Sequence, residues 1–282
     1  MKKLRELKRK PLSLFLRLIM LLATGITAFV IIFLVGYILI KGIPNLTPDL
    51  FAWKYNSDNV SLVPALINTV IMTLITLIVA VPLGIFAAIY LVEYAKRGNK
   101  LVSVVRMAAE TLSGIPSIVY GLFGMLFFVV ALKWGLSLLA GVFTLAIMIL
   151  PLIMRTTEEA LMSVPDSFRE GSFALGAGKL RTVFAVVLPS AVPGILAGVI
   201  LAVGRIVGET AALIFTAGTV ARIPKNLLSS ARTLSVHMYN LSNEGLYINQ
   251  TYATAVVLLA LVICINAASS YIAKKIAGGH NG

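Results

Sequence analysis

The sequence predicts an all-α, polytopic membrane protein with about six transmembrane helices, and three observations support this fold class. Hydrophobic residues make up 59% of the 282 residues and charged residues only 12%, about half the charged fraction of a typical soluble domain. The apolar residues occur in runs of about 20, the length that crosses a bilayer as a helix. The net charge of +13 lies mostly between these runs, which favours lipid headgroups over nucleic acid as its partner.

Six apolar runs are the predicted spans, namely residues 18–40, 63–92, 116–132, 136–154, 191–217 and 252–272. The first run follows a basic segment, residues 1–17, but it is longer than the apolar part of a signal peptide and lacks a small-residue cleavage site. We therefore expect a retained helix and one transmembrane domain over residues 18–282. The link of residues 133–135 is so short that the third and fourth helices should be antiparallel neighbours.

The loop charges predict the orientation, because cytoplasmic loops carry an excess of Lys and Arg. With the N-terminus inside, seventeen of the 24 basic residues lie in cytoplasmic segments and six in external ones. The sequence thus predicts a multi-pass protein of the bacterial inner (plasma) membrane with both termini cytoplasmic. Two long excursions stand out: a cytoplasmic one, residues 155–189, and an external one, residues 219–251.

The cytoplasmic excursion contains its own helix signals. Pro165 should end the preceding helix, and Ser167 and Glu170 have the Ser-x-x-Glu spacing of a capping box. Gly176 and Gly178 follow within a few residues, and glycine commonly ends a helix. We predict a short helix here, then a glycine break and a second helix that ends at Pro189.

These residues resemble the "EAA" motif found in permease subunits of binding-protein-dependent ABC importers. That motif reads Glu-Ala-Ala, three residues, Gly, nine residues, then Ile-x-Leu-Pro. Here the matching positions depart from it only by conservative changes, and they are Glu170, Gly171, Ser172, Gly176, Val186, Leu188 and Pro189.

The resemblance implies an ABC importer permease fold in which the short helix is a coupling helix that docks on a separate ATPase subunit. Phe168 and Leu175 are seven residues apart and share one face as candidate anchors. The candidate coupling residues are Phe168, Glu170, Gly171, Ser172, Leu175 and Gly176. The chain has no Walker A loop, so we expect a non-catalytic subunit without a cofactor, and ATP and Mg used by the partner ATPase.

Further segments look like the PstA-type permease of the bacterial phosphate importer, namely residues 114–124, 204–218 and 234–245. The resemblance implies a membrane subunit that forms half of the translocation path for inorganic phosphate. It also implies a second permease (PstC-type), two ATPase subunits (PstB-type) and an external phosphate-binding protein (PstS-type) as partners.

Charged and polar residues inside the apolar runs are the candidates for the substrate path. Arg205 and Glu209 lie four apart, so a continuous helix would place them on one face. They are interpreted either as a structural ion pair or as a polar patch on the path, and intramembrane charges favour the second. Ser117 and Tyr120 follow a Gly-Ile-Pro turn, and a helix that begins there offers free N–H groups to an anion.

Several other features favour structural explanations. Two Gly-x-x-x-Gly patterns, which begin at Gly194 and Gly204, indicate close helix packing. Asn68 and Thr69 should form hydrogen bonds across helices. Residues at helical spacing between Leu227 and Leu241 predict an amphipathic external helix, on which His237 should be an ordinary surface residue.

Other functional classes remain as alternatives. An ion-coupled secondary transporter would need no ATPase, but such proteins usually show paired repeats or interrupted helices in both halves. An ABC permease for a different oxyanion fits the same residues. A membrane enzyme lacks a recognisable catalytic cluster here, and two histidines and one cysteine, Cys264, predict no metal site.

Overall fold

A computed structural model describes residues 11–96 and 98–278 of the chain, and the described residues are helical without strands. Five helices are long and apolar enough to cross a membrane, and a bent pair of helices makes a sixth candidate. The long helices are α2 (Pro11–Gly42), α3 (Val63–Ile89), α6 (Leu138–Met162), α9 (Leu188–Gly208) and α12 (Ile248–Gly278). The shorter ones are α4 (Lys100–Ser113), α5 (Ser117–Gly124), α7 (Asp166–Ala174), α8 (Lys179–Thr182), α10 (Ala211–Thr216) and α11 (Leu234–Glu244).

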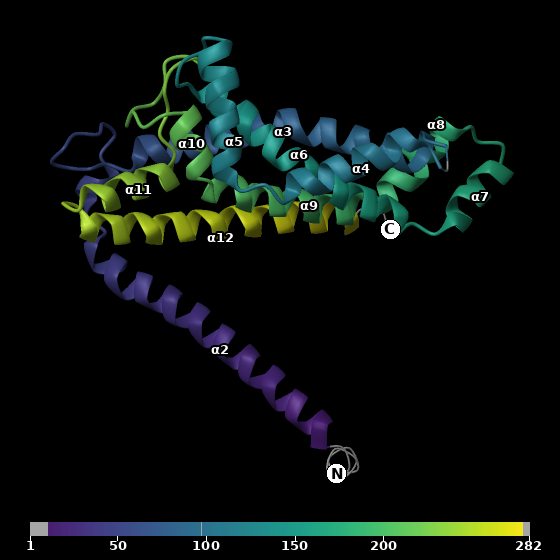
Figure 1. Cartoon of the computed structure of the whole chain (residues 1–282), viewed down its shortest axis with the longest axis horizontal. Helices are drawn as coiled ribbons and strands as arrows, with labels where there is room; N and C mark the ends of the chain where they lie inside the picture. Colours follow the sequence, from purple (N-terminus) through teal and green to yellow (C-terminus); the bar gives the residue numbers. More distant parts are fainter. Residues whose placement is uncertain (1–10, 97, 279–282) are drawn as a thin grey trace.

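Helices α3, α6, α9 and α12 run side by side and form the body of the molecule (Figure 1). Helix α6 is central, because it packs extensively against both α3 and α9. Its buried core residues include Leu145, Ile149 and Ile153. Helix α11 lies at one end of the bundle and α7 at the other, and these are called the α11 end and the α7 end below.

Helix α2 leaves the bundle and contacts it only near its own C-terminal end (Figure 1). There Gly42 meets the backbone of Tyr252 in α12 so closely that a Cβ atom would collide with it. Residues 11–17, predicted to belong to the basic segment, are part of this helix, and residues 1–10 lie outside the described part of the chain.

The third predicted span is interrupted. Helix α4 and the helical stretch Ser117–Ala131, which joins α5 to a π-helical turn, meet at an angle of 104°. The break falls at residues 114–116, where Pro116 is extended and cannot donate a helical hydrogen bond. Helix α5 therefore stands across the bundle (Figure 1), and the expectation that it runs antiparallel to α6 is wrong.

The fifth predicted span, residues 191–217, also differs from the structure. A continuous helical stretch begins earlier, at Lys179, and ends at Gly208, so Pro189 does not end a separate helix. A π-helical turn, Val183–Val187, precedes Pro189. Its altered hydrogen-bond pattern lets the helix continue although Pro189 has no N–H to donate. Glu209 is extended, and the six-residue helix α10 follows after Thr210.

The excursion of residues 219–251, predicted to be external, covers the start of α6 with irregular backbone. The N–H groups of Leu138 and Leu139 donate to the carbonyls of Ser229 and Leu227, at 2.9 and 2.8 Å. The predicted amphipathic helix begins only at Leu234, and Leu227 lies outside it. The reason is that the open N-terminal N–H groups of α6 bind the carbonyls of this segment and hold it outside a helix.

Candidate functional site

Arg205 lies in the last turn of α9, beside the interrupted third span. Its side chain is half-buried and makes no ion pair within the described residues. The Arg205 charge lies close enough to Tyr120 of α5 to interact with it electrostatically, and Tyr120 is buried. The hydroxyl of Tyr120 donates to the carbonyl of Leu112 in α4 at 2.7 Å, so Tyr120 bridges the two halves of the break. Ser117 is the first residue of α5, at the same break.

Glu209 does not pair with Arg205, because α9 ends one residue before it. The expected shared helix face is therefore wrong. The carboxylate of Glu209 accepts a hydrogen bond from the N–H of Ala212 at 3.1 Å, and its backbone carbonyl accepts from the hydroxyl of Ser235 at 2.5 Å. Glu209 thus holds α10 and α11 together at the second break in the bundle.

Helix α7 is the short helix predicted for residues 155–189, and none of its residues is buried. Phe168 is 50% exposed, and Leu175, just beyond the helix, is 91% exposed. Glu170 and Gly171 are also exposed. The chain turns at Gly176 with φ of +81°, a conformation that favours glycine. A short, exposed helix of this kind is suited to dock on a partner protein.

The start of α7 differs from the predicted capping box. The helix begins at Asp166 with Pro165 as its N-cap and no side-chain capping bond, because a carboxylate in the first turn already complements the helix dipole. Ser167 therefore lies inside the helix. Ser172 bonds with Thr182 of α8, with 2.9 Å between the hydroxyl oxygens, which closes the loop between the two helices.

Arg169 anchors α7 to the bundle, and sequence reasoning missed it. Its guanidinium donates to Glu93, which lies in the π-helical turn Tyr90–Tyr94 that continues α3, at 2.7 and 3.1 Å. It also donates to the carbonyls of Leu161 and Val164, at 2.9 and 2.8 Å. The one sequence signal is an acidic residue that closes the apolar run of α3.

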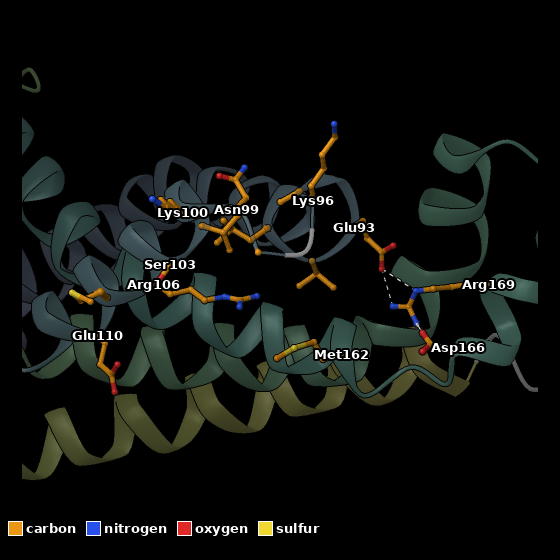
Figure 2. Close-up of a pocket in the computed structure, with 16 residues that line it drawn as sticks. Glu93, Lys96, Asn99, Lys100, Ser103, Arg106, Glu110, Met162, Asp166 and Arg169 are labelled. Carbon is orange, nitrogen blue, oxygen red and sulfur yellow. Dashed lines mark hydrogen bonds and ion pairs between the residues drawn. The ribbon is translucent and has the colours of Figure 1, made fainter.

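A cavity of about 1170 Å³ lies at the α7 end, between the start of α4 and the start of α7 (Figure 2). A second cavity of about 650 Å³ adjoins it between α4 and α6 and reaches Ser113 and Pro151. Arg106, Glu110 and Met162 line both cavities. None of these residues was predicted, because each lies in a segment that reads as an ordinary loop or helix end.

At the α11 end, a cluster of buried polar side chains joins the loop before α3 to α11. Arg232 is 4% exposed, and its guanidinium lies 4.8 Å from the centre of the Tyr55 ring. His237 is fully buried and packs edge-on against the same ring, so its expected surface position is wrong. Burial, and next the charge of Arg232, lower the pKa of His237 to about 3.

The structure also tests the expectations for Asn68, Thr69 and the two Gly-x-x-x-Gly patterns. Asn68 donates to the carbonyls of Arg222 and Arg232, and Thr69 accepts from the N–H of Leu234 at the start of α11. The predicted bond across helices is thus confirmed for Thr69, whereas both partners of Asn68 lie in irregular backbone. A Cβ atom on Gly194 or Gly198 would collide with Ala160 or Thr156 of α6, whereas Gly204 and Gly208 face open space. The first glycine pair therefore packs within the chain.

The comparisons with known sequences agree on one kind of protein. A family model described as the inner membrane component of binding-protein-dependent transport systems matches residues 80–278. The chain is 37% identical over 240 residues to the probable ABC transporter permease protein YqgI of Bacillus subtilis (strain 168), covering 80% of this chain and 81% of that protein. It is 37% identical over 228 residues to the phosphate transport system permease protein PstA of Yersinia pestis, covering 80% and 76%.

Solved structures give the same fold at low sequence identity. A chain of a bacterial alginate ABC transporter, in complex with an alginate pentasaccharide-bound periplasmic protein, has a TM-score of 0.70 at 16% identity, covering 97% of each chain. A chain of the MetNI methionine ABC transporter in an inward-facing conformation has a TM-score of 0.59 at 22% identity, covering 76% of this chain and 94% of that one. At these identities the likeness concerns the fold alone.

Proposed function

The chain belongs to the family of binding-protein-dependent transport system inner membrane components, and we propose that it is the permease subunit of an ATP-driven phosphate importer. Membership of this family confirms the predicted class of multi-pass, non-catalytic inner-membrane subunit. A relative at 37% identity is named as a phosphate transport permease. That name supports phosphate as the substrate of this chain.

The observation that carries the proposal is the position of Arg205. Its guanidinium is half-buried in an apolar bundle and has no acidic partner among the described side chains. A charge within a membrane span is costly unless it is paired. A guanidinium binds phosphate oxygens in a planar, bidentate way, so a passing oxyanion is a suited partner for it.

Residues at the break of the third span support the same path. Ser117 begins α5, so the free N–H groups of the first α5 turn lie at the interruption. Tyr120 is bound to α4 by its hydroxyl and lies within reach of the Arg205 charge. We propose that Arg205 and Ser117 contact the oxyanion, while Tyr120 supports the path by holding the break through its bond to Leu112. Glu209 shapes the path through the backbone of α10 and α11 rather than by pairing with Arg205.

Helix α7 is the proposed contact with the ATPase subunit. Phe168 on α7 and Leu175 just beyond it are exposed and apolar, and the open space at Gly171 and Gly176 permits close approach. Glu170 is exposed on the same helix. Arg169 ties the helix to the spans, so a movement of α7 is transmitted to α3 and α6. We propose that two ATPase subunits (PstB-type) bind ATP and Mg, and that one of them docks on α7.

The proposed orientation places the α7 end in the cytoplasm, as the loop charges favour. Both termini are then cytoplasmic, and the α11 end faces the external phosphate-binding protein (PstS-type). A second permease (PstC-type) completes the path. The open faces of Gly204 and Gly208 on α9 are suited to close packing against that subunit.

Uptake by the assembled importer tests the proposal. The purified complex with its binding protein is placed in liposomes, and radioactive phosphate uptake is measured with and without ATP. We expect ATP-dependent phosphate uptake that excess sulfate does not suppress. Uptake of a different oxyanion in place of phosphate would contradict the proposed substrate, and uptake that needs an ion gradient but no ATP would contradict the proposed class.

A further inference from the structure

Two adjoining cavities connect the middle of the bundle with the α7 end. The smaller one, of about 650 Å³, reaches Ser113 at the end of α4, next to the break where α5 begins. The larger one, of about 1170 Å³, reaches Lys96 and Asn99 at the α7 end. Because both are lined by the same three residues, Arg106, Glu110 and Met162, their junction lies there.

An ion pair stands at this junction. Nη2 of Arg106 in α4 bonds to Oε1 of Glu158 in α6, and the two side chains are 48% and 10% exposed. The carboxylate is thus buried in the helix interface, whereas the guanidinium stays accessible from the cavities. Figure 2 shows the Arg106 side chain projecting across the larger cavity toward Met162.

The other charges of the cavities have different surroundings. Arg169 is engaged by Glu93 and by two backbone carbonyls, and Arg155 pairs with Glu159 on the same helix. Lys96 and Lys100 are exposed at the rim. Arg106 is therefore the one cation among the described residues that line both cavities, and Glu158 pairs with it. Glu110, one helical turn further along α4, is an exposed carboxylate at the same junction and makes no ion pair within the described residues.

We propose that the Arg106–Glu158 pair is an anion-selective constriction on the inner half of the translocation path. The inference rests on the proposed function, because it assumes an oxyanion that leaves the α4–α5 break toward the α7 end. The anion replaces Glu158 as the partner of Arg106 and is then displaced by Glu158. The exchange keeps the guanidinium compensated but leaves the buried Glu158 carboxylate without its partner. This cost drives Glu158 back to Arg106, so the anion is attracted without being trapped.

Charge-selective thiol labelling tests the constriction without using phosphate. Ser113 is replaced by Cys in a Cys264→Ala background, within the assembled importer in inside-out vesicles. Small thiosulfonate reagents carrying either a sulfonate or a trimethylammonium group are added, and the modification of this chain is followed by mass spectrometry. We expect the sulfonate reagent to react faster than its cationic counterpart, because it passes Arg106.

Substitutions at the pair then change this preference. Arg106→Gln should lower the rate of the sulfonate reagent about fivefold or more while sparing the cationic reagent. Glu158→Gln should raise the sulfonate rate about twofold or more, since it frees the guanidinium. If Arg106→Gln does not assemble, the double variant Arg106→Gln/Glu158→Gln strands no charge and should show the same loss of preference.

The matched control is Lys100→Gln, which removes the same charge from the same helix at the rim of the larger cavity. We expect it to change the sulfonate rate less than about twofold, because exposed charges are screened. An equal effect of Lys100→Gln and Arg106→Gln would overturn the proposal. So would an unchanged preference in Arg106→Gln, or an introduced thiol at position 113 that neither reagent reaches.

Phosphate uptake separates this inference from the proposed function. Normal uptake by the parent importer together with normal uptake by Arg106→Gln would overturn the constriction and leave the function intact. No phosphate uptake by the parent importer, with an intact sulfonate preference at position 113, would contradict the substrate while supporting an anion path.

Discussion

Nη2 of Arg169 lies 2.7 Å from Oε1 of Glu93, so one ion pair joins α7 to the end of the α3 span. The two residues are 76 positions apart in the chain, and their side chains are only 15% and 8% exposed. The same guanidinium donates hydrogen bonds to two backbone carbonyls at the end of α6. A force on α7 is therefore transmitted to two spans through a single side chain.

Breaking this pair should destabilise the protein and uncouple it. Arg169→Gln leaves Glu93 buried without its partner, which typically costs about 3 kcal/mol or more. We expect a lower melting temperature and less uptake per ATP hydrolysed. Arg155→Gln is the control for stability, because the Arg155–Glu159 pair is 61% and 60% exposed and should contribute less than about 1 kcal/mol. Equal melting temperatures of the two variants would argue against the anchor.

The exposed end of α7 gives a sharper test of ATPase docking. Leu175→Glu places a charge on a side chain that is 91% exposed, so it should leave the stability of the isolated chain nearly unchanged. We expect about a tenfold or greater loss of ATPase association in detergent, since a buried charge at an interface is costly. Leu246→Glu is the matched control, because Leu246 is 81% exposed but lies at the α11 end. Full association of the Leu175→Glu variant would remove the docking assignment.

The buried histidine predicts a pH dependence of stability. Its pKa of about 3 lies below the value of about 6.5 in the unfolded chain, so the unfolded state alone takes up a proton between these values. Stability should therefore be complete above about pH 6.5 and fall by up to about 1.4 kcal/mol per pH unit below it. His237→Phe keeps a ring beside Tyr55 and should flatten the dependence of the melting temperature on pH between about pH 6.5 and 4.5. Identical pH profiles of the variant and the parent would refute this.

The orientation is tested by labelling intact cells. In a Cys264→Ala background, single cysteines replace Lys96 at the α7 end and Asn243 at the α11 end, both of which are exposed. An impermeant thiol reagent should label the thiol at position 243 directly and the thiol at position 96 only after the cells are opened. The reverse pattern would invert the proposed topology.

The sequence was sufficient for the fold class, the six apolar segments and the short α7 helix, because apolar run length and glycine spacing are local signals. The hydrogen bond of Thr69 to the start of α11 was also predictable, since a polar side chain in lipid needs a partner. These expectations depend on one segment at a time. The structure confirms the all-helical fold and the α7 helix, and it has five long apolar helices with a bent pair as a sixth candidate.

The breaks and the buried contacts were not predictable in the same way. Hydropathy does not reveal the interruption at Glu209, because α9 and α10 together form one apolar run. The burial of His237 depends on Tyr55, which lies in a distant loop. The Arg106–Glu158 and Glu93–Arg169 pairs join separate helices, and such pairs emerge only when the helices are packed together.

The structure also changes the expected behaviour of Arg205 and Glu209. If Arg205 and Glu209 formed a structural pair, removing both charges would restore the stability that is lost when either one is removed. The Glu209 carboxylate instead accepts a hydrogen bond from the N–H of Ala212. We therefore expect Glu209→Gln to keep much of the capping bond, and the double variant Arg205→Gln/Glu209→Gln to be no better than Arg205→Gln alone. Recovery of uptake and stability in the double variant would show that the two charges form a pair after all.

ATP-driven phosphate uptake by Arg205 variants of the assembled importer in liposomes tests the central claim most directly. A charge-assisted hydrogen bond contributes about 1.5–3 kcal/mol, so Arg205→Gln should lower uptake by roughly tenfold to a hundredfold while the complex assembles normally. Arg205→Lys should recover part of the uptake, because it keeps the charge but lacks the planar fork. Parent-level phosphate uptake by a fully assembled Arg205→Gln importer would contradict the account.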